Sequence, residues 1–157
     1  MAPPFIKIRR CQQGDLSAVA AIEARFFSKS SLLPLFSFIQ YFDLFSDLFF
    51  VAISKGKVVG FVVGGLISAD QSQGWLLDIA VAKNLHRRGV GEKLCRNLFQ
   101  RFKQLRVKKV YATCSPSNNA SQGLLGQFGF RKSRSIQNYF GPKEHRLLLV
   151  CKFRNRN

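Results

Sequence analysis

The spacing of apolar residues along the chain predicts a mixture of strands and helices. Apolar positions recur every three or four residues after Asp15 and again through residues 90–105, which is the period of a helix with one buried face. Shorter apolar or alternating runs have the length of strands. The expected strands are 5–9, 48–53, 58–67, 75–81, 109–114, 130–136 and 146–153. The expected helices are a segment capped by Asp15, part of 35–45, 90–105 and 119–127.

The order of these elements is β-α-α-β-β-β-α-β-α-β-β. This order is typical of an α/β protein with a mixed sheet and helices on its faces. At 157 residues the chain has the size of one ordinary domain, and no linker divides it. We therefore expect residues 1–157 to form a single domain.

A stretch rich in Phe and Leu, residues 32–53, raises the question of a membrane span. Pro34, Asp43 and Asp47 interrupt it, and a spanning helix rarely tolerates two carboxylates. The first residues also lack an apolar run of signal-peptide length. We expect a protein that does not enter the membrane.

Charge and cysteine content add two constraints. The formal net charge of +17 favours polyanionic partners, namely nucleic acid, anionic membrane or a phosphate-rich small molecule, although a solvated basic surface is the simpler interpretation. The four cysteines are far apart and both histidines are isolated, so we expect no metal site. Dispersed cysteines in a chain without a secretion signal are typical of buried, reduced thiols in the cytoplasm.

The segment with the clearest chemistry is residues 77–92, LDIAVAKNLHRRGVGE. An apolar strand leads into a loop with Gly89 and Gly91, and the loop opens directly into the basic helix. Glycines allow a ligand to approach the backbone, and the first N–H groups of a helix bind anions such as a pyrophosphate. Leu94 stands where the dinucleotide-binding fingerprint needs a third glycine, and the Gly-Lys-Ser/Thr ending of a Walker loop is absent.

This segment resembles motif A of the GNAT superfamily of N-acetyltransferases, whose signature is Q/R-x-x-G-x-G/A after a strand. His86 occupies the Gln/Arg position and departs from the signature, whereas the following RRGVG fits it. A downstream segment, SNNA followed by LL and FGF in residues 117–130, is similar to a second family motif. The two motifs and the element order cover nearly the whole chain. The resemblance implies the GNAT fold, acetyl-coenzyme A as cosubstrate and no metal.

The resemblance also implies how acetyl-CoA binds. Backbone groups of Ile79, Ala80 and Val81 would pair with the pantetheine arm, and the Val81 N–H would hold the oxyanion. The pyrophosphate would be held by backbone N–H groups of six consecutive residues, which are Arg87, Arg88, Gly89, Val90, Gly91 and Glu92. Asn118 would reach the pantetheine, although an N-cap for the next helix explains an Asn there nearly as well.

The catalytic groups are less evident, because Thr113 and Leu125 replace the Glu or His and the Tyr that many relatives carry. Asp78, on the strand entering motif A, is the best-placed carboxylate for the base; the alternative is a partner of an Arg or Lys, or a hydrogen-bonded structural group. Tyr139 is another catalytic candidate, and it lies in an Asn-Tyr-Phe loop that resembles the substrate-contacting loop of RimI-like N-terminal acetyltransferases. Phe27 belongs to an aromatic stretch that forms either core or an apolar wall of the acceptor groove.

Acetyl transfer to a protein or peptide N-terminal amine is therefore the leading hypothesis. A small-molecule amine is the main alternative, because Thr113 and Leu125 depart from the RimI-like subgroup. A non-catalytic GNAT module that binds acetyl-CoA or docks to RNA is a further alternative. The charge of +17 disfavours a very basic acceptor and suits acidic acceptors or ribosomal RNA.

Overall fold

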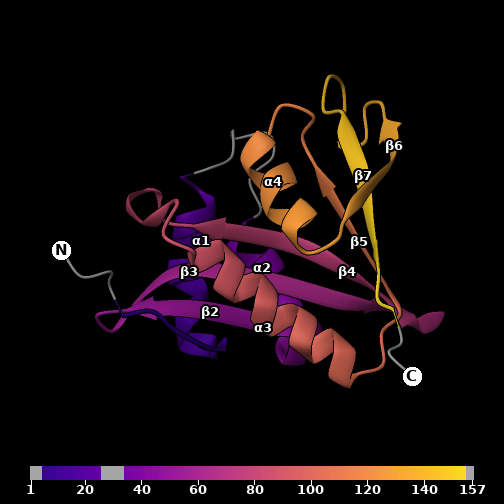
Figure 1. Ribbon diagram of the computed structural model, residues 1–157. Helices are drawn as coiled ribbons and strands as arrows, with labels where there is room; N and C mark the ends of the chain where they lie inside the picture. The colour runs from indigo at the N-terminus through magenta and orange to yellow at the C-terminus, as the bar shows by residue number, and fades with distance from the viewer. Residues whose placement is uncertain (1–4, 26–33, 155–157) are drawn as a thin grey trace. The chain divides into compact units, whose positions relative to one another are not determined.

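The computed structural model describes residues 5–25 and 34–154 (Figure 1). The strands within these residues are β1 (Lys7–Arg10), β2 (Phe49–Ser54), β3 (Lys57–Ile67), β4 (Asp70–Val81), β5 (Lys109–Cys114), β6 (Arg131–Ile136) and β7 (Arg146–Lys152). The α-helices are α1 (Leu16–Glu23), α2 (Leu35–Phe45), α3 (Val90–Gln104) and α4 (Asn119–Gln127).

The predicted order of strands and helices is confirmed. The strands form a seven-stranded sheet in the order β1-β2-β3-β4-β5-β7-β6, with a parallel pairing of β4 and β5 beside antiparallel pairs. Strand β4 starts at Asp70, five residues before the start predicted at residue 75. The residues that begin it are polar, so apolar periodicity could not detect them.

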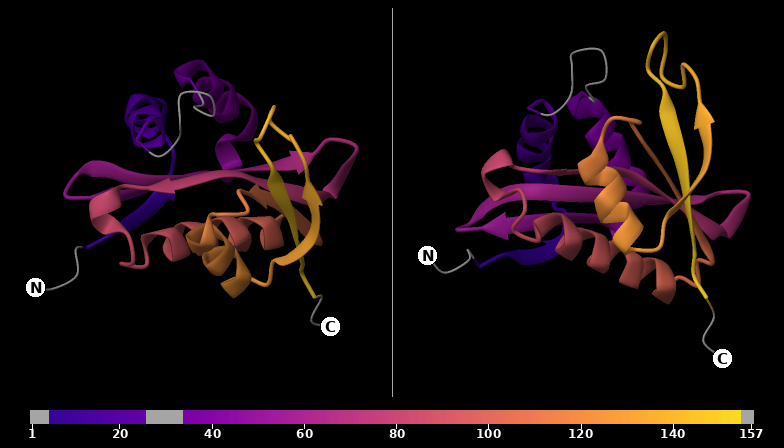
Figure 2. Two further views of the ribbon diagram at one scale, coloured as in Figure 1. Left: turned by 90° about the horizontal axis from the view of Figure 1, so that it is seen from above. Right: turned by 45° about the horizontal axis from the view of Figure 1, so that its top comes forward.

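The chain divides into two compact units, residues 1–64 with 78–101 and residues 65–77 with 102–157. In the first unit α1 and α2 cover one face of β1, β2 and β3, and α3 covers the other face (Figure 2). The buried rings of Phe38, Phe49 and Phe61 pack edge to face or tilted against one another in its core. The Phe-rich stretch is thus partly core, while Phe36 and Leu44 on α2 are exposed.

Helix α3 confirms the predicted apolar seam. Val90, Leu94 and Leu98 are at most 1% exposed, at the helical spacing read from the sequence. The helix begins at Val90, immediately after Gly89, whose φ of 74° is a left-handed conformation that glycine adopts readily. The start of α3 is therefore fixed by a backbone conformation that the sequence supplies.

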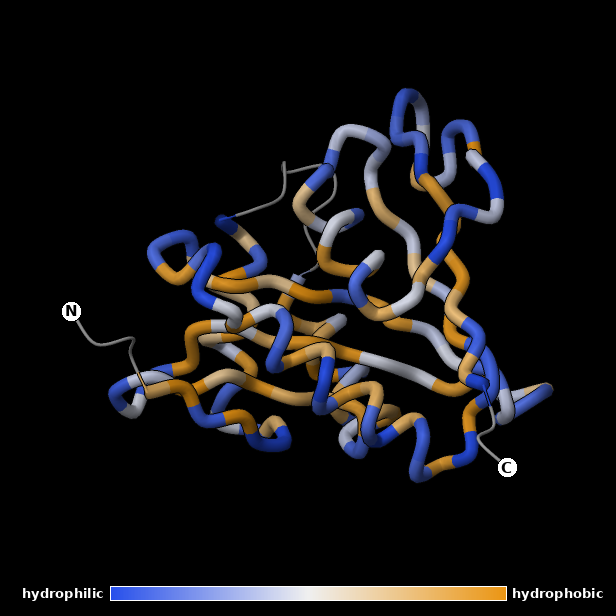
Figure 3. Tube along the Cα trace, in the orientation of Figure 1, coloured by the Kyte–Doolittle hydropathy of each residue, from blue (hydrophilic) through white to orange (hydrophobic). Residues whose placement is uncertain are grey.

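The second unit contains β5, β6, β7, α4 and the first part of β4. One face of its sheet is buried, with Val110, Ala112 and Cys151 between 0% and 3% exposed, and the Cys151 thiol donates to the Phe128 carbonyl after α4. Strand β6 lies at the sheet edge. Its first five residues are exposed, and it appears blue beside the orange β7 in Figure 3.

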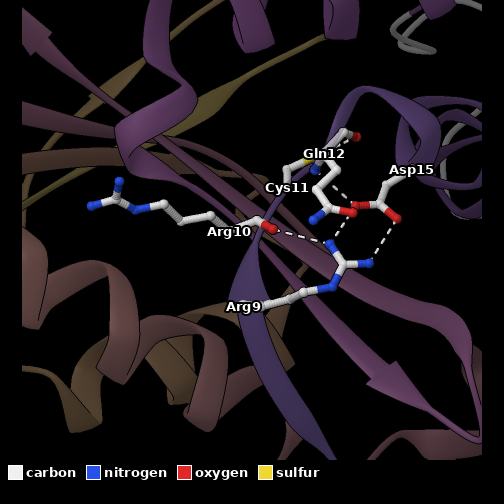
Figure 4. Close-up of polar contacts among 5 residues, drawn as sticks. All are labelled: Arg9, Arg10, Cys11, Gln12 and Asp15. Carbon is white, nitrogen blue, oxygen red and sulfur yellow. Dashed lines mark hydrogen bonds and ion pairs between the residues drawn. The ribbon is translucent and has the colours of Figure 1, made fainter.

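Asp15 does not cap α1 through its side chain, contrary to the prediction. Its carboxylate instead forms a bidentate pair with Arg9, at 2.6 and 3.0 Å, and accepts the Gln12 N–H at 2.8 Å (Figure 4). The hydrogen bond from Arg9 is the main reason that the pKa of Asp15 is lowered. The Asp15 carboxylate therefore binds Arg9 of β1 and the Gln12 N–H instead of the first N–H groups of α1.

All four cysteines are free and buried, as predicted for the thiols. Burial raises the pKa of Cys11 and Cys95 to about 12, which keeps them protonated. Among the residues described, no helix has the length and apolarity to cross a bilayer. Within the same residues, no cluster of three or more His, Cys, Asp or Glu side chains could hold a metal ion.

Candidate active site

The first unit brings together two carboxyl groups, one from α1 and one from β4. Glu23 is the last residue of α1 and is only 2% exposed, and Asp78 lies on β4. The two side chains share a hydrogen bond, and the Asp78 carboxylate also accepts the Ile79 N–H. Asp78 therefore has an acidic partner rather than the Arg or Lys considered from the sequence.

This carboxyl pair holds a proton that an isolated carboxyl would release. Burial is the largest cause that raises the pKa of Glu23, and the nearby Asp78 charge raises it further. Burial also raises the pKa of Asp78, while its hydrogen bonds from Glu23 and Ile79 oppose the rise. Two carboxyl groups in contact cannot both ionise without strong repulsion, so they share one proton. Glu23 is the donor and Asp78 the acceptor in that arrangement.

One oxygen of each carboxyl group, Glu23 Oε2 and Asp78 Oδ2, is buried without a hydrogen-bond partner among the described residues. A buried unpaired oxygen is unfavourable, and such groups are concentrated where proteins bind ligands or perform chemistry. Tyr41 on α2 lies within the field of both acids: burial first, then the charges of Asp78 and Glu23, raise the pKa of its hydroxyl. The pair thus combines a shared proton with two unpartnered oxygens, and its charge acts on the Tyr41 hydroxyl.

The predicted anion-binding loop also belongs to the first unit. Residues 86–89 are exposed, and Arg87 joins Gly89 in the left-handed region with a φ of 58°. The Lys93 N–H donates to the Gly89 carbonyl at 3.0 Å, so the N–H groups of Val90, Gly91 and Glu92 precede the backbone ladder of α3. The Glu92 carboxylate is turned to Arg96 one helical turn later, which neutralises its charge beside the helix start.

The backbone at the end of β4 shows which groups are directed away from β3. The Ala82 N–H donates to the Val59 carbonyl at 2.8 Å. Because backbone groups of a strand point alternately to its two sides, those of Ile79 and Val81 point away from β3 and those of Ala80 point towards it. Of the three residues predicted to pair with pantetheine, Ile79 and Val81 have the suitable direction.

His86, which stands where the family signature has Gln or Arg, has a hydrogen-bond partner on β4. Its Nε2 lies 2.7 Å from the Val81 carbonyl oxygen and so ties the loop back to the strand. Because a carbonyl oxygen accepts, Nε2 is the donor in this bond, and the carbonyl retains a second lone pair. The imidazole thereby braces the first turn of the loop against the end of β4.

Asn118 lies in the second unit and serves as the N-cap of α4. Its Oδ1 accepts the Ser121 N–H at 3.0 Å, which is the alternative that the sequence also allowed. Capping uses the oxygen of the amide, and its NH2 group is of the type that donates to a carbonyl of pantetheine. The predicted contact with the cosubstrate stays a prediction.

Tyr139 also lies in the second unit, in the loop between β6 and β7, and is 42% exposed. The loop is held by Asn138, which has a φ of 53°, donates its N–H to His145 Nδ1 at 3.1 Å and accepts the Lys143 N–H at 2.9 Å. Tyr139 packs edge to face on Phe140, with ring centroids 4.7 Å apart. The loop is therefore preorganised to present an aromatic pair.

Three other residues from the sequence analysis can be placed. Leu125 is 2% exposed and belongs to the core of the second unit, which explains why an apolar side chain stands there. Thr113 is half-buried on β5 opposite Leu148. Phe27 lies outside the described residues, so its predicted role in the acceptor groove stays a prediction.

Sequence reasoning missed Glu23 and Tyr41. A signal for Glu23 exists, because it falls four residues after Val19 and seven after Leu16, on the apolar face of α1. A carboxylate on a buried stripe needs a buried partner or a proton. No comparable signal marks Tyr41, which lies in a run of aromatic residues.

Comparison with known proteins agrees with this geometry. The model of the acetyltransferase (GNAT) family matches residues 16–130. The chain belongs to this family. It is accordingly an acetyl-CoA-dependent N-acetyltransferase, and the fold expected from the GNAT resemblance is confirmed.

Relatives of this GNAT protein span most of its length. An uncharacterized N-acetyltransferase of Methanocaldococcus jannaschii is 25% identical over 92% of this chain and 90% of its own. An N-alpha-acetyltransferase of Sulfolobus acidocaldarius is 25% identical over 75% of this chain and 76% of its own. The crystal structure of Ard1 from Thermoplasma volcanium superposes with a TM-score of 0.86 at 21% identity, covering 96% of this chain and 99% of that one.

Proposed function

We propose that the protein acetylates the α-amine of a protein or peptide N-terminus, with the Glu23–Asp78 carboxyl pair as proton acceptor. The observation that supports this most directly is the buried pair itself, with a pKa raised in both members. A base that titrates closer to neutrality than a free carboxyl matches an α-amine, whose pKa is about 8, better than a lysine amine at about 10.4.

In the proposed reaction the neutral amine attacks the thioester carbonyl carbon. The proton released by the amine passes to the Asp78 carboxylate, and the C–S bond breaks to release coenzyme A as its thiolate, which then takes up a proton. A thiolate leaves readily because its conjugate acid has a pKa of about 8.5, so the apolar Leu125 does not preclude the reaction. The Val81 N–H, directed away from β3, would stabilise the oxyanion.

The proposed acetyl-CoA site uses the loop and the end of β4. The pyrophosphate would lie on N–H groups of residues 87–92, with the helix dipole and the arginines of the loop adding positive potential. Ile79 and Val81 would pair with the pantetheine. Asn118 and Tyr139 remain our proposed contacts for the pantetheine and for the acceptor, and residues 1–157 our proposed single domain.

The acceptor class is supported by the name of the Sulfolobus relative, an N-alpha-acetyltransferase, and by the preorganised Tyr139 loop. A small-molecule amine is the competing acceptor, since Thr113 and Leu125 depart from the RimI-like pattern. The free, buried thiols support a cytoplasmic location, because cysteines in oxidising compartments tend to form disulfides. The excess of positive charge supports association with ribosomal RNA.

The test measures thiol release with acetyl-CoA and a panel of peptides, amino acids and diamines. Asp78→Asn should lower kcat by about 100-fold or more while the affinity for acetyl-CoA, measured by calorimetry, stays the same. Asp70→Asn is the matched control, because it makes the same change on the same strand at an exposed site. Unchanged kcat in Asp78→Asn would refute the base, and turnover only with small amines would refute the peptide acceptor.

A further inference from the structure

The second unit has a sheet face that carries two stacked aromatic residues and is partly accessible to solvent. The pairing register aligns Trp75 on β4 with Tyr111 on β5, Tyr111 with Val150 on β7, and Val150 with Arg131 on β6. Residues aligned across strands lie on the same face of the sheet. This row therefore runs across four strands, about 14 Å at the usual spacing of about 4.8 Å.

Burial separates the two faces of this sheet. The neighbouring row, with Val110 and Cys151, is at most 3% exposed and faces α4 and the end of α3, where a Cβ on Gly74 would lie 2.8 Å from the Phe102 ring. The row of Trp75 and Tyr111 is only half-buried and ends in the exposed Arg131. Two large aromatic rings of the unit, Trp75 and Tyr111, thus lie on its more solvent-accessible face.

Two of these residues form a stacked aromatic platform. The rings of Trp75 and Tyr111 stack with centroids 5.4 Å apart at an interplanar angle of 28°, and the Lys109 ammonium lies 5.2 Å from the Tyr111 centroid. The Tyr111 hydroxyl donates to Gln73 at 2.8 Å, which fixes the ring. Stacked cross-strand rings stabilise a sheet, and on an accessible face the outer ring surface of such a pair also offers a place on which a nucleobase stacks.

Cations surround the platform. Arg131 and Arg134 on β6 align with Val150 and Leu148, and Lys152 on β7 aligns with Lys109 on β5. The sequence of this unit contains two carboxylates, Asp70 and Glu144. Asp70 is engaged by Ser72 and Gln73, and Glu144 lies 3.9 Å from Arg146, so both have local partners. The platform therefore lies in a strongly positive field.

We propose that this basic aromatic face, defined by Trp75, Lys109, Tyr111, Arg131, Arg134 and Lys152, binds single-stranded RNA. The cations match a phosphate backbone, and the rings match unstacked bases. An acidic peptide would use the cations and leave the rings without a function. Unpaired bases are exposed in the loops and single strands of RNA, whereas cellular DNA mostly keeps its bases inside a duplex.

The chain supplies its own reporter for the test. Trp75 is the single tryptophan, so its fluorescence reports on this face alone. A 12-nucleotide single-stranded RNA of mixed sequence should quench Trp75 and bind with a Kd that weakens about 50-fold between 50 and 200 mM salt, as four phosphate contacts predict. Oligoglutamate of equal charge should bind more weakly and leave the fluorescence unchanged. The measurements need no acetyl-CoA, so they are independent of the proposed acetyl transfer.

Two variants on one strand provide a matched comparison. Arg134 and Lys132 are both exposed, but Arg134 aligns with Leu148 on the aromatic face and Lys132 aligns with Leu149 on the opposite face. By fluorescence anisotropy of labelled RNA, Arg134→Gln should weaken binding about three- to tenfold and Lys132→Gln less than twofold. Trp75→Leu should weaken it about tenfold, with the melting temperature recorded for each variant.

Each outcome decides the proposal. Quenching with the larger loss in Arg134→Gln supports it. Equal losses in Arg134→Gln and Lys132→Gln would overturn it in favour of diffuse charge attraction. Equal binding and quenching by oligoglutamate would overturn it in favour of an acidic protein partner, and no binding of RNA at 50 mM salt would remove it altogether.

Discussion

The two compact units of the protein are both basic, but they differ in how many carboxylates are available to pair with their cations. In the first unit several arginines pair with acids: Arg9 with Asp15, and both Arg10 and Arg101 with Asp47. In the second unit the described cations far outnumber its two carboxylates. They are Lys103, Arg106, Lys108, Lys109, Arg131, Lys132, Arg134, Lys143, Arg146, Lys152 and Arg154.

This difference indicates a division of labour. Paired charges fix the positions of β1, α1 and α3 and leave one buried acid pair, Glu23 and Asp78, whose proton is available for chemistry. Unpaired positive charge generates a field that extends beyond the surface and attracts polyanions. The net charge of +17 is therefore informative only when its distribution is known.

The largest expected effect concerns the loop of the first unit. Gly89→Val should weaken acetyl-CoA binding by about 100-fold or more, because a branched side chain is strained at a φ of 74° and its methyl groups would occupy the approach to the N–H groups. Isothermal calorimetry measures the affinity. Gly56→Val is the matched control, with a φ of 75° in the turn between β2 and β3 and equally open space around its Cβ. Equal losses of affinity in both would contradict a role for the loop.

A second experiment isolates the carboxyl pair through pH. The raised folded-state pKa of Glu23 means that the folded protein binds a proton that the unfolded chain releases near pH 4.3, so wild-type stability falls as pH rises towards the folded value. Glu23→Gln removes this term. The melting temperature of Glu23→Gln relative to wild type should therefore rise between pH 5 and pH 9. A difference independent of pH would show that the two acids do not share a proton.

A smaller effect should distinguish the paired acids of the first unit from the surface acids of the second. Asp15→Asn breaks the bidentate contact with Arg9 and should lower the melting temperature at pH 7 by roughly 5 °C. Because the folded pKa of Asp15 is lowered, this loss should shrink as pH falls below about 4. Asp70→Asn, at an exposed site, should change the melting temperature by about 1 °C or less. Similar shifts in both variants would remove the contrast between the units.

Most of the fold could be predicted because its elements have clear periods. The seam of Val90, Leu94 and Leu98 and the alternation of β5 follow from local burial patterns. The start of β4 could not be predicted, since Asp70 and its neighbours are polar and give no apolar periodicity. The predicted capping role of Asp15 was wrong because its carboxylate binds Arg9, a cation on the preceding strand β1.

The candidate site was partly accessible to sequence reasoning. The glycine loop has a local signature, and the structure gives it the left-handed backbone that the signature requires. Asp78 was recognised by its place on an apolar strand, but its partner Glu23 is distant in sequence and meets it only in the folded chain. Pairs that are distant in sequence leave no periodic pattern. The one signal for this pair was the position of Glu23 on the apolar face of α1.

The edge position of β6 has a consequence for solubility. A strand at the end of a sheet presents unpaired backbone groups that can join the edge of another copy. In β6 the charged Arg131, Lys132 and Arg134 and an irregular register between Lys132 and Arg134 make such stacking unfavourable. The charges of β6 thus also oppose edge-to-edge association of two molecules. Replacing all three with neutral residues should lower solubility and promote self-association.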